Sequence, residues 1–195
     1  MAQAKSSSSS GPSAGFSLAE VLISMGILTA VSLGVAQLFA VSTRANLVAR
    51  GQTSTTAMAE QKLEQLRSLT WGFDTAGQGL PVSDTSSNLA VDPPTQSGGG
   101  LNPYTVASLD LNTAGYVDFL DANGQYVGTG TTPPGTAAFI RRWSVRPLPT
   151  NPNNTLVLQV LVTPVANEGS RVGGGPRQRM PGDALLVSVK TRKSQ

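Results

Sequence analysis

The sequence predicts an α+β protein in which one long N-terminal helix packs on a C-terminal antiparallel β-sheet. Three observations lead to this prediction. Residues 16–43 form an apolar stretch with a single charged side chain, and residues 45–69 continue it as an amphipathic stretch without proline. The last third of the chain holds segments in which apolar residues alternate with others, which is typical of strands.

The apolar stretch is long enough to cross a membrane. A bilayer core about 30 Å thick needs about 20 apolar helical residues, and residues 16–43 are rich in leucine and alanine and contain no proline. Glu20 is the anomaly, because a charge near the centre of a membrane helix costs about 2.5–3.5 kcal/mol and usually has a partner. No Lys or Arg lies within two helical turns of Glu20 in the sequence. The nearest plausible cation is an α-amino group at Phe16, which exists only if the chain is cut after Gly15.

Residues 1–15, MAQAKSSSSSGPSAG, are predicted to be a leader outside the fold, because they are rich in serine and lack apolar residues for a core. A secretory signal is one alternative for this end of the chain, although its apolar region would be only about 7–15 residues long. An ordinary single-pass anchor is the other alternative, with Glu20 as an unpaired residue near the membrane surface.

The segment GFSLAEVL, which runs from Gly15 to Leu22, resembles the cleavage motif of type IV prepilins and pseudopilins. It has a glycine at the end of a polar leader, then an aromatic residue, and an acid at the fifth position of the apolar run. The resemblance implies the pilin fold and a prepilin peptidase that cuts between Gly15 and Phe16 and N-methylates the new amine. It also implies that Glu20 pairs with this amine when the subunit joins a filament.

The amphipathic residues 44–71 are predicted to extend the helix into a soluble domain. Ala59, Leu63 and Leu66 fall on one stripe with a period near 3.6, so this stripe is expected to face a core. The whole helix would span about 55 residues, or about 80 Å at 1.5 Å per residue. It is expected to end at Trp71-Gly72, with Gly72 in a left-handed conformation. The phrase AMAEQKLEQLRSL resembles the helix end of PilV/GspI-type minor pilins.

Residues 72–103 are rich in glycine and proline and are predicted to form a long irregular loop that adds little to the core. Residues 104–195 are predicted to form the sheet of the globular domain. Residues 104–106 would be a short strand, and residues 116–127 a hairpin with Asn123-Gly124 at its turn. Asp118, Asp121 and Asn123 also suggest calcium, but they supply fewer oxygens than the six to eight of such a site.

Three stronger strands are predicted at residues 139–145, 156–162 and 184–190. Turns between them favour an antiparallel sheet, whose apolar face is expected to pack on Leu63 and Leu66. Trp143 is expected to anchor that contact, with Arg141 as an intruding charge on the same face. In the last strand, the apolar face is predicted to consist of Leu185, Val187 and Val189. The order F-I-R-R-W-S-V again resembles PilV-like minor pilins.

The composition argues against chemistry at a catalytic site. The chain has no cysteine and no histidine, which excludes disulfides and removes the commonest metal ligand and general base. We therefore expect no enzyme activity, no cofactor and no metal. The net charge is only +3. The basic loop with Arg171, Arg177 and Arg179 lacks the interleaved aromatic residues of single-strand binders, so nucleic acid is an unlikely partner.

The sequence thus predicts a minor type IV pilin held in the bacterial inner membrane and then assembled into a pilus. Its implied partners are prepilin peptidase, other pilin subunits and the inner-membrane assembly platform. A minor pseudopilin of a type II secretion system is the nearest alternative. A permanently anchored periplasmic binding domain is an alternative from a different class. These residues do not distinguish adhesion, DNA uptake, motility and secretion as the purpose of the filament.

Overall fold

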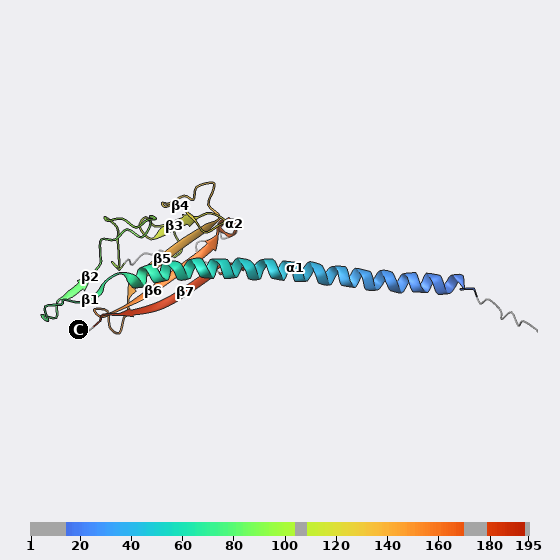
Figure 1. Ribbon diagram of the computed structural model, residues 1–195, viewed down its shortest axis with the longest axis horizontal. Helices are drawn as coiled ribbons and strands as arrows, with labels where there is room; N and C mark the ends of the chain where they lie inside the picture. The colour runs from blue at the N-terminus through green and yellow to red at the C-terminus, as the bar shows by residue number, and fades with distance from the viewer. Residues whose placement is uncertain (1–14, 104–108, 170–178, 194–195) are drawn as a thin grey trace, which may run out of the picture. The chain divides into compact units, whose positions relative to one another are not determined.

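The computed structural model describes residues 15–103, 109–169 and 179–193. The chain divides into two units, Met1–Asn46 and Leu47–Gln195, which are described separately below. Helix α1, Leu18–Ser68, contributes to both units and is 51 residues long (Figure 1). The expected continuous helix is therefore confirmed. The expected leader, residues 1–15, lies outside the described residues except for Gly15, and so does the expected strand at residues 104–106.

The second unit contains a five-stranded antiparallel sheet in the order β4-β3-β5-β6-β7. Its strands are β3 Val117–Leu120, β4 Tyr126–Gly128, β5 Phe139–Pro147, β6 Thr155–Pro164 and β7 Ala184–Thr191. Strands β5, β6 and β7 are neighbours in the sheet in the order in which they occur along the chain, as consecutive strands commonly are. Together with α1, this sheet confirms the predicted α+β class.

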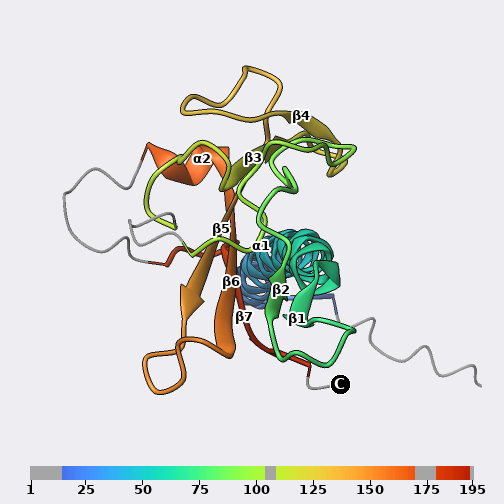
Figure 2. The same ribbon diagram turned by 90° about the vertical axis from the view of Figure 1, so that its left-hand side faces the viewer.

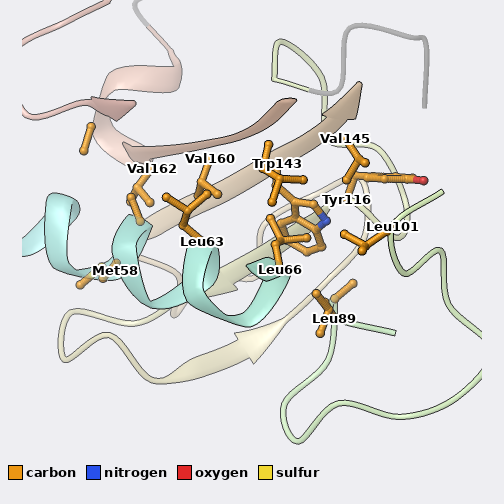
Figure 3. Close-up of a cluster of buried hydrophobic side chains, with 14 of the residues drawn as sticks. Met58, Leu63, Leu66, Leu89, Leu101, Tyr116, Trp143, Val145, Val160 and Val162 are labelled. Carbon is orange, nitrogen blue, oxygen red and sulfur yellow. The ribbon is translucent and has the colours of Figure 1, made fainter. Parts of the chain in front are cut away.

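The C-terminal part of α1 packs on one face of this sheet (Figure 2). Figure 3 shows Leu63 and Leu66 directed toward the strands that carry Val160 and Trp143. Leu66 is completely buried, and Trp143 is 1% exposed. Apolar residues one helical turn apart therefore meet the inward-facing residues of two neighbouring strands, which is how an amphipathic helix covers a sheet.

The opposite face of the sheet has its own, smaller cluster. Val117, Phe119 and Ile140 are buried there, and Val165 of the short helix α2, Val165–Glu168, packs against them. Arg142 is also buried on this face, where its guanidinium donates to Asn112 Oδ1 at 2.9 Å and pairs with Glu168. Both faces of the central strands are thus covered.

The predicted end of the helix is wrong. Helix α1 ends at Ser68, and Trp71–Phe73 forms strand β1 of a two-stranded sheet with β2, Pro81–Ser83. Gly72 lies opposite Val82 in extended backbone rather than in a left-handed helix cap. The alternation of Trp71 and Phe73 around a glycine suits a strand, and pairing with β2 decides the conformation over the local capping signal.

The prediction that residues 72–103 add little to the core is also wrong. Leu89, Ala90 and Leu101 are buried in the main cluster, at 5%, 2% and 0% exposure. The loop is held by the Asp84 carboxylate, which accepts hydrogen bonds from the backbone N–H groups of Ser86 and Ser87 and from the Ser87 hydroxyl. The hydrogen bond from the Ser87 hydroxyl is the largest cause of a lowered Asp84 pKa. Local polar contacts thus let a segment without regular structure pack tightly.

The hairpin predicted within residues 116–127 is confirmed as β3 and β4. Leu120 lies opposite Tyr126, the Asp121 N–H donates to the Gln125 carbonyl at 2.8 Å, and Gly124 has a positive φ of 79°. The positive φ explains the glycine at this position, because other residues rarely adopt that conformation.

The face assigned to the last strand is wrong. The register places Ser188 opposite Leu158, so Leu186, Ser188 and Lys190 share the face that α1 covers. Leu185, Val187 and Val189 point away from that face and are 38%, 54% and 55% exposed. Because side chains alternate along a strand, the hydrophobic pattern of β7 alone indicated the wrong face, and pairing with β6 sets the register.

Candidate functional site: an apolar helix with an unpaired glutamate

The first part of α1 is exposed along its whole length. Every residue from 18 to 50 is exposed, and the first buried residue of the helix is Thr55. The most apolar 18-residue window has a mean hydropathy of 2.0, and none of it is buried by the chain. Of the helices that the structure describes, α1 alone is long enough and apolar enough to cross a membrane. Its composition is thus compatible with membrane anchoring.

Glu20 lies in the first turn of α1 and is exposed. A negative charge in the first turn is favourable with respect to the helix dipole, but that interaction is worth only about 0.3–1 kcal/mol. The ion pairs of the described residues involve Lys62, Arg67, Arg141 and Arg142, and none involves Glu20. The apolar half of the helix therefore carries one carboxylate without a cation from the described part of the chain.

Gly15 and Phe16 precede the helix, which begins at Leu18. Both are exposed and have no regular secondary structure, and the Phe16 side chain is 83% exposed. A side chain added at Gly15 would meet no other atom within 4 Å. The peptide bond between them thus lies in accessible, non-helical backbone, the form in which a peptidase can bind it.

The three expected packing residues belong to one cluster in the second unit. Leu63, Leu66 and Trp143 are 8%, 0% and 1% exposed. The Trp143 ring also faces the Lys62 ammonium, which lies 4.6 Å from its centroid, and a Tyr116 ring at 6.5 Å. Trp143 therefore contributes both apolar area and a cation–π contact to the attachment of α1.

Sequence reasoning missed a buried ionic network centred on Asp118. The Arg141 guanidinium forms two hydrogen bonds with its carboxylate, Nε to Oδ1 and Nη2 to Oδ2, both at 2.9 Å. The Lys62 Nζ lies 2.8 Å from Oδ2. Arg141 Nη1 also donates to the Met58 carbonyl at 3.1 Å, and Lys62 Nζ donates to the Leu89 carbonyl at 2.7 Å. The network thus connects α1, β3, β5 and the loop after β2.

Burial is the main cause that lowers the pKa of Lys62 to about 8. Asp118 opposes the shift by attraction, and Arg141 adds to it by repulsion. The feature of the sequence that indicated this network was Arg141, a charged residue on the inward face of an apolar strand. Its partner could not be read from the sequence, because the pairing of Asp118 with Arg141 depends on β3 lying beside β5.

The two aspartates considered as calcium ligands, Asp118 and Asp121, have different partners in the structure. The Asp118 carboxylate is held in the buried network, whereas the Asp121 carboxylate accepts backbone hydrogen bonds from Asn123 and Gln125, each at 2.8 Å. In the basic loop, Arg171 and Arg177 lie outside the described residues, and Arg179 is exposed.

Comparison with known proteins gave no match: no family model fits the chain, and no curated protein or solved structure is significantly similar to it.

Proposed function

We propose that the chain is a minor type IV pilin made as a prepilin, cut after Gly15, N-methylated at Phe16 and assembled into a type IV pilus or related filament. The observation that carries this proposal is the apolar half of α1, which the described chain leaves uncovered and which holds one unpaired acid in its first turn. Prepilin peptidase, other pilin subunits and an inner-membrane assembly platform are its proposed partners.

The uncovered apolar surface of α1 is suited to two environments that the protein would occupy in turn, the membrane and the filament. Lipid would cover it in the bacterial inner membrane, and neighbouring helices of the same kind would cover it in a filament. Both environments remove apolar side chains such as Leu28 and Leu38, which are 67% and 73% exposed, from water.

The position of Glu20 supports a cut after Gly15. The cut would create an ammonium at Phe16, two residues before α1 begins at Leu18 and four before Glu20. If the new N-terminus joined the helix, the two charges would be neighbours on its surface, because residues four apart lie on one side of a helix. A buried charge without a partner is strongly unfavourable, and a pair offsets part of that cost. Cleavage would thus supply the cation that the described chain does not provide.

The N-terminus of the protein expressed in a host with a prepilin peptidase tests the proposal. We expect mass spectrometry to find N-methyl-Phe16 as the first residue. The Gly15→Val variant should keep its leader, because a branched side chain at the cut site obstructs the peptidase. Gly26→Ala is the matched control, since an added Cβ there also meets nothing within 4 Å, and it should be cut normally.

An intact leader on the native protein would contradict the proposal and favour a permanently anchored periplasmic binding domain. A cut elsewhere would favour a secretory signal. A minor pseudopilin of a type II secretion system would carry the same modified Phe16, and the filament into which the protein is incorporated distinguishes it.

A further inference from the structure

A cavity of about 500 Å³ lies in the second unit where α1 ends beside β1 and β7. Three kinds of groups line it: cations, aromatic rings and hydroxyls. The lining residues that matter here are Arg67, Lys190, Lys193, Trp71, Phe73 and Thr191. We name this hollow the basic cavity.

Among the described residues, the positive charge around the basic cavity is only partly compensated. Burial and then repulsion from Lys193 and Arg67 lower the pKa of Lys190, so these three cations lie close enough to oppose one another. In the described part of the chain, the ion pair at this cavity is the exposed contact of Arg67 with Glu64, at 2.8 Å. Among the described residues, one carboxylate thus pairs with one of the three cations, and an anion entering the cavity would relieve their repulsion.

Arg192 adds a fourth positive charge beside the cavity. Its guanidinium donates to the carbonyls of Asn153 and Gly72 and to the Ser83 hydroxyl. Among the described residues, its side-chain hydrogen bonds go to these neutral oxygens, so its charge is held in place without being neutralised.

Two aromatic residues, Trp71 and Phe73, line the basic cavity. The Arg192 guanidinium carbon lies 3.7 Å from the centroid of the Trp71 ring and 5.8 Å from that of Phe73. Both rings also border a second hollow of about 670 Å³, which Arg192, Asn153 and Asn154 line. Trp71 and Phe73 therefore lie between the two hollows and line both of them.

We infer that the basic cavity binds an acidic saccharide, with its carboxylate at Lys190 and Lys193 and a sugar ring against Trp71. Binding sites commonly combine an apolar wall with a few polar groups that fix orientation, and the hydroxyls of Thr70 and Thr191 suit sugar hydroxyls. The cations converge on one cavity, whereas a nucleic acid backbone needs a groove that follows successive phosphates. This inference does not depend on the proposed function.

Substitution of Lys193 can test binding to the basic cavity without affecting the stability of the fold. Lys190 donates to the Arg67 carbonyl in the last turn of α1, and Arg192 holds β1, so replacing either one also loosens the fold. Lys193 is exposed, and its ammonium forms no ion pair or hydrogen bond with any described residue. Its replacement should therefore weaken binding and leave stability unchanged.

Trp71 provides the readout. The chain has two tryptophans, and Trp143 is 1% exposed in the core, so a ligand at the basic cavity changes the emission of Trp71. We expect trigalacturonate to change the fluorescence of the full chain in detergent micelles, with a saturation that weakens as salt is added. Lys193→Gln should raise the Kd about fivefold, as loss of one exposed ionic contact implies.

Arg146→Gln is the matched control, because it removes one exposed positive charge from β5 without touching the cavity; its Kd should equal that of the native chain. Trp71→Phe should abolish the signal. The inference is overturned if trigalacturonate gives no saturable change, or if both Gln variants weaken binding equally. It is also overturned if oligothymidylate or oligoglutamate of equal charge binds as tightly, because charge alone would then explain the site.

Discussion

The two halves of α1 have similar helical geometry and opposite surroundings. Residues 18–50 are exposed throughout, whereas the half that begins at Thr55 buries Ala59, Leu63 and Leu66 against the sheet. The buried half is attached by apolar contacts and by the network of Lys62, Asp118 and Arg141. In the exposed half, Glu20 is the one charged side chain of residues 16–43. Apolar side chains thus have different surroundings in the two halves: in one they pack on the sheet and stabilise the domain, and in the other the described chain leaves them uncovered.

The largest expected effect comes from breaking the buried network. Asp118→Ala should lower the free energy of unfolding by about 3–5 kcal/mol, because it leaves Lys62 and Arg141 buried without their carboxylate. Glu60→Ala, an exposed acid on the same half of α1, should change it by less than about 0.5 kcal/mol. Denaturant unfolding of the full chain in detergent, followed by tryptophan fluorescence, measures both. Equal effects would show that the network contributes no stability.

A Leu→Ala substitution made once in each half of α1 compares the two halves directly. Leu66→Ala should destabilise the domain by about 2–5 kcal/mol, because it opens a cavity at a fully buried site. Leu28→Ala, at a side chain 67% exposed, should leave the unfolding midpoint unchanged. The same denaturant measurement applies, and a destabilised Leu28→Ala variant would mean that the domain depends on the apolar half.

The third effect depends on pH. The pKa of Lys62 falls to about 8 in the folded chain from the ordinary 10.5, so the unfolded chain binds more protons between these values. The free energy of unfolding should therefore rise with pH from about 8 to 10.5, by about 1–3 kcal/mol. Comparing the native chain with Lys62→Met isolates this rise, because the variant lacks the titrating group. Parallel curves for the two proteins would contradict the assignment.

The smallest expected effect concerns which side chains of β7 face the core. Val187→Thr on β7 should change stability by less than about 0.5 kcal/mol, because Val187 is 54% exposed. Val160→Thr on β6 should cost about 1–3 kcal/mol, because it buries a hydroxyl in an apolar cluster. Thermal unfolding of the two variants is the measurement, and a reversed order would restore the face first assigned to β7.

The sequence was sufficient for the features that periodicity specifies. The helix through Leu63 and Leu66, the hairpin around Gly124 and the strand with Trp143 were all predicted and are present. Features that depend on partners far along the chain were not. Gly72 joins a strand because β2 lies beside it, and Val187 faces away from α1 because β6 sets the register.

The candidate site divides in the same way. Glu20 could be found from the sequence, because a lone charge in an apolar run is visible there. The Asp118 network and the basic cavity could not, because each brings together residues from separate elements: Lys62 with Arg141, and Trp71 with Lys190. Only the pairing of β3 with β5, and the return of β7 to the end of α1, make those contacts possible.

Incorporation of Glu20 variants into filaments tests most directly the proposal that this acid pairs with an amine created by a cut after Gly15. Glu20→Gln keeps the shape of the side chain and removes its charge, whereas Glu60→Gln removes an exposed charge from the same helix. We expect Glu20→Gln to be inserted in the membrane and cut normally but to be missing from the filament fraction sheared from cells, with Glu60→Gln present at the native level. Native amounts of Glu20→Gln in sheared filaments would contradict the assigned role.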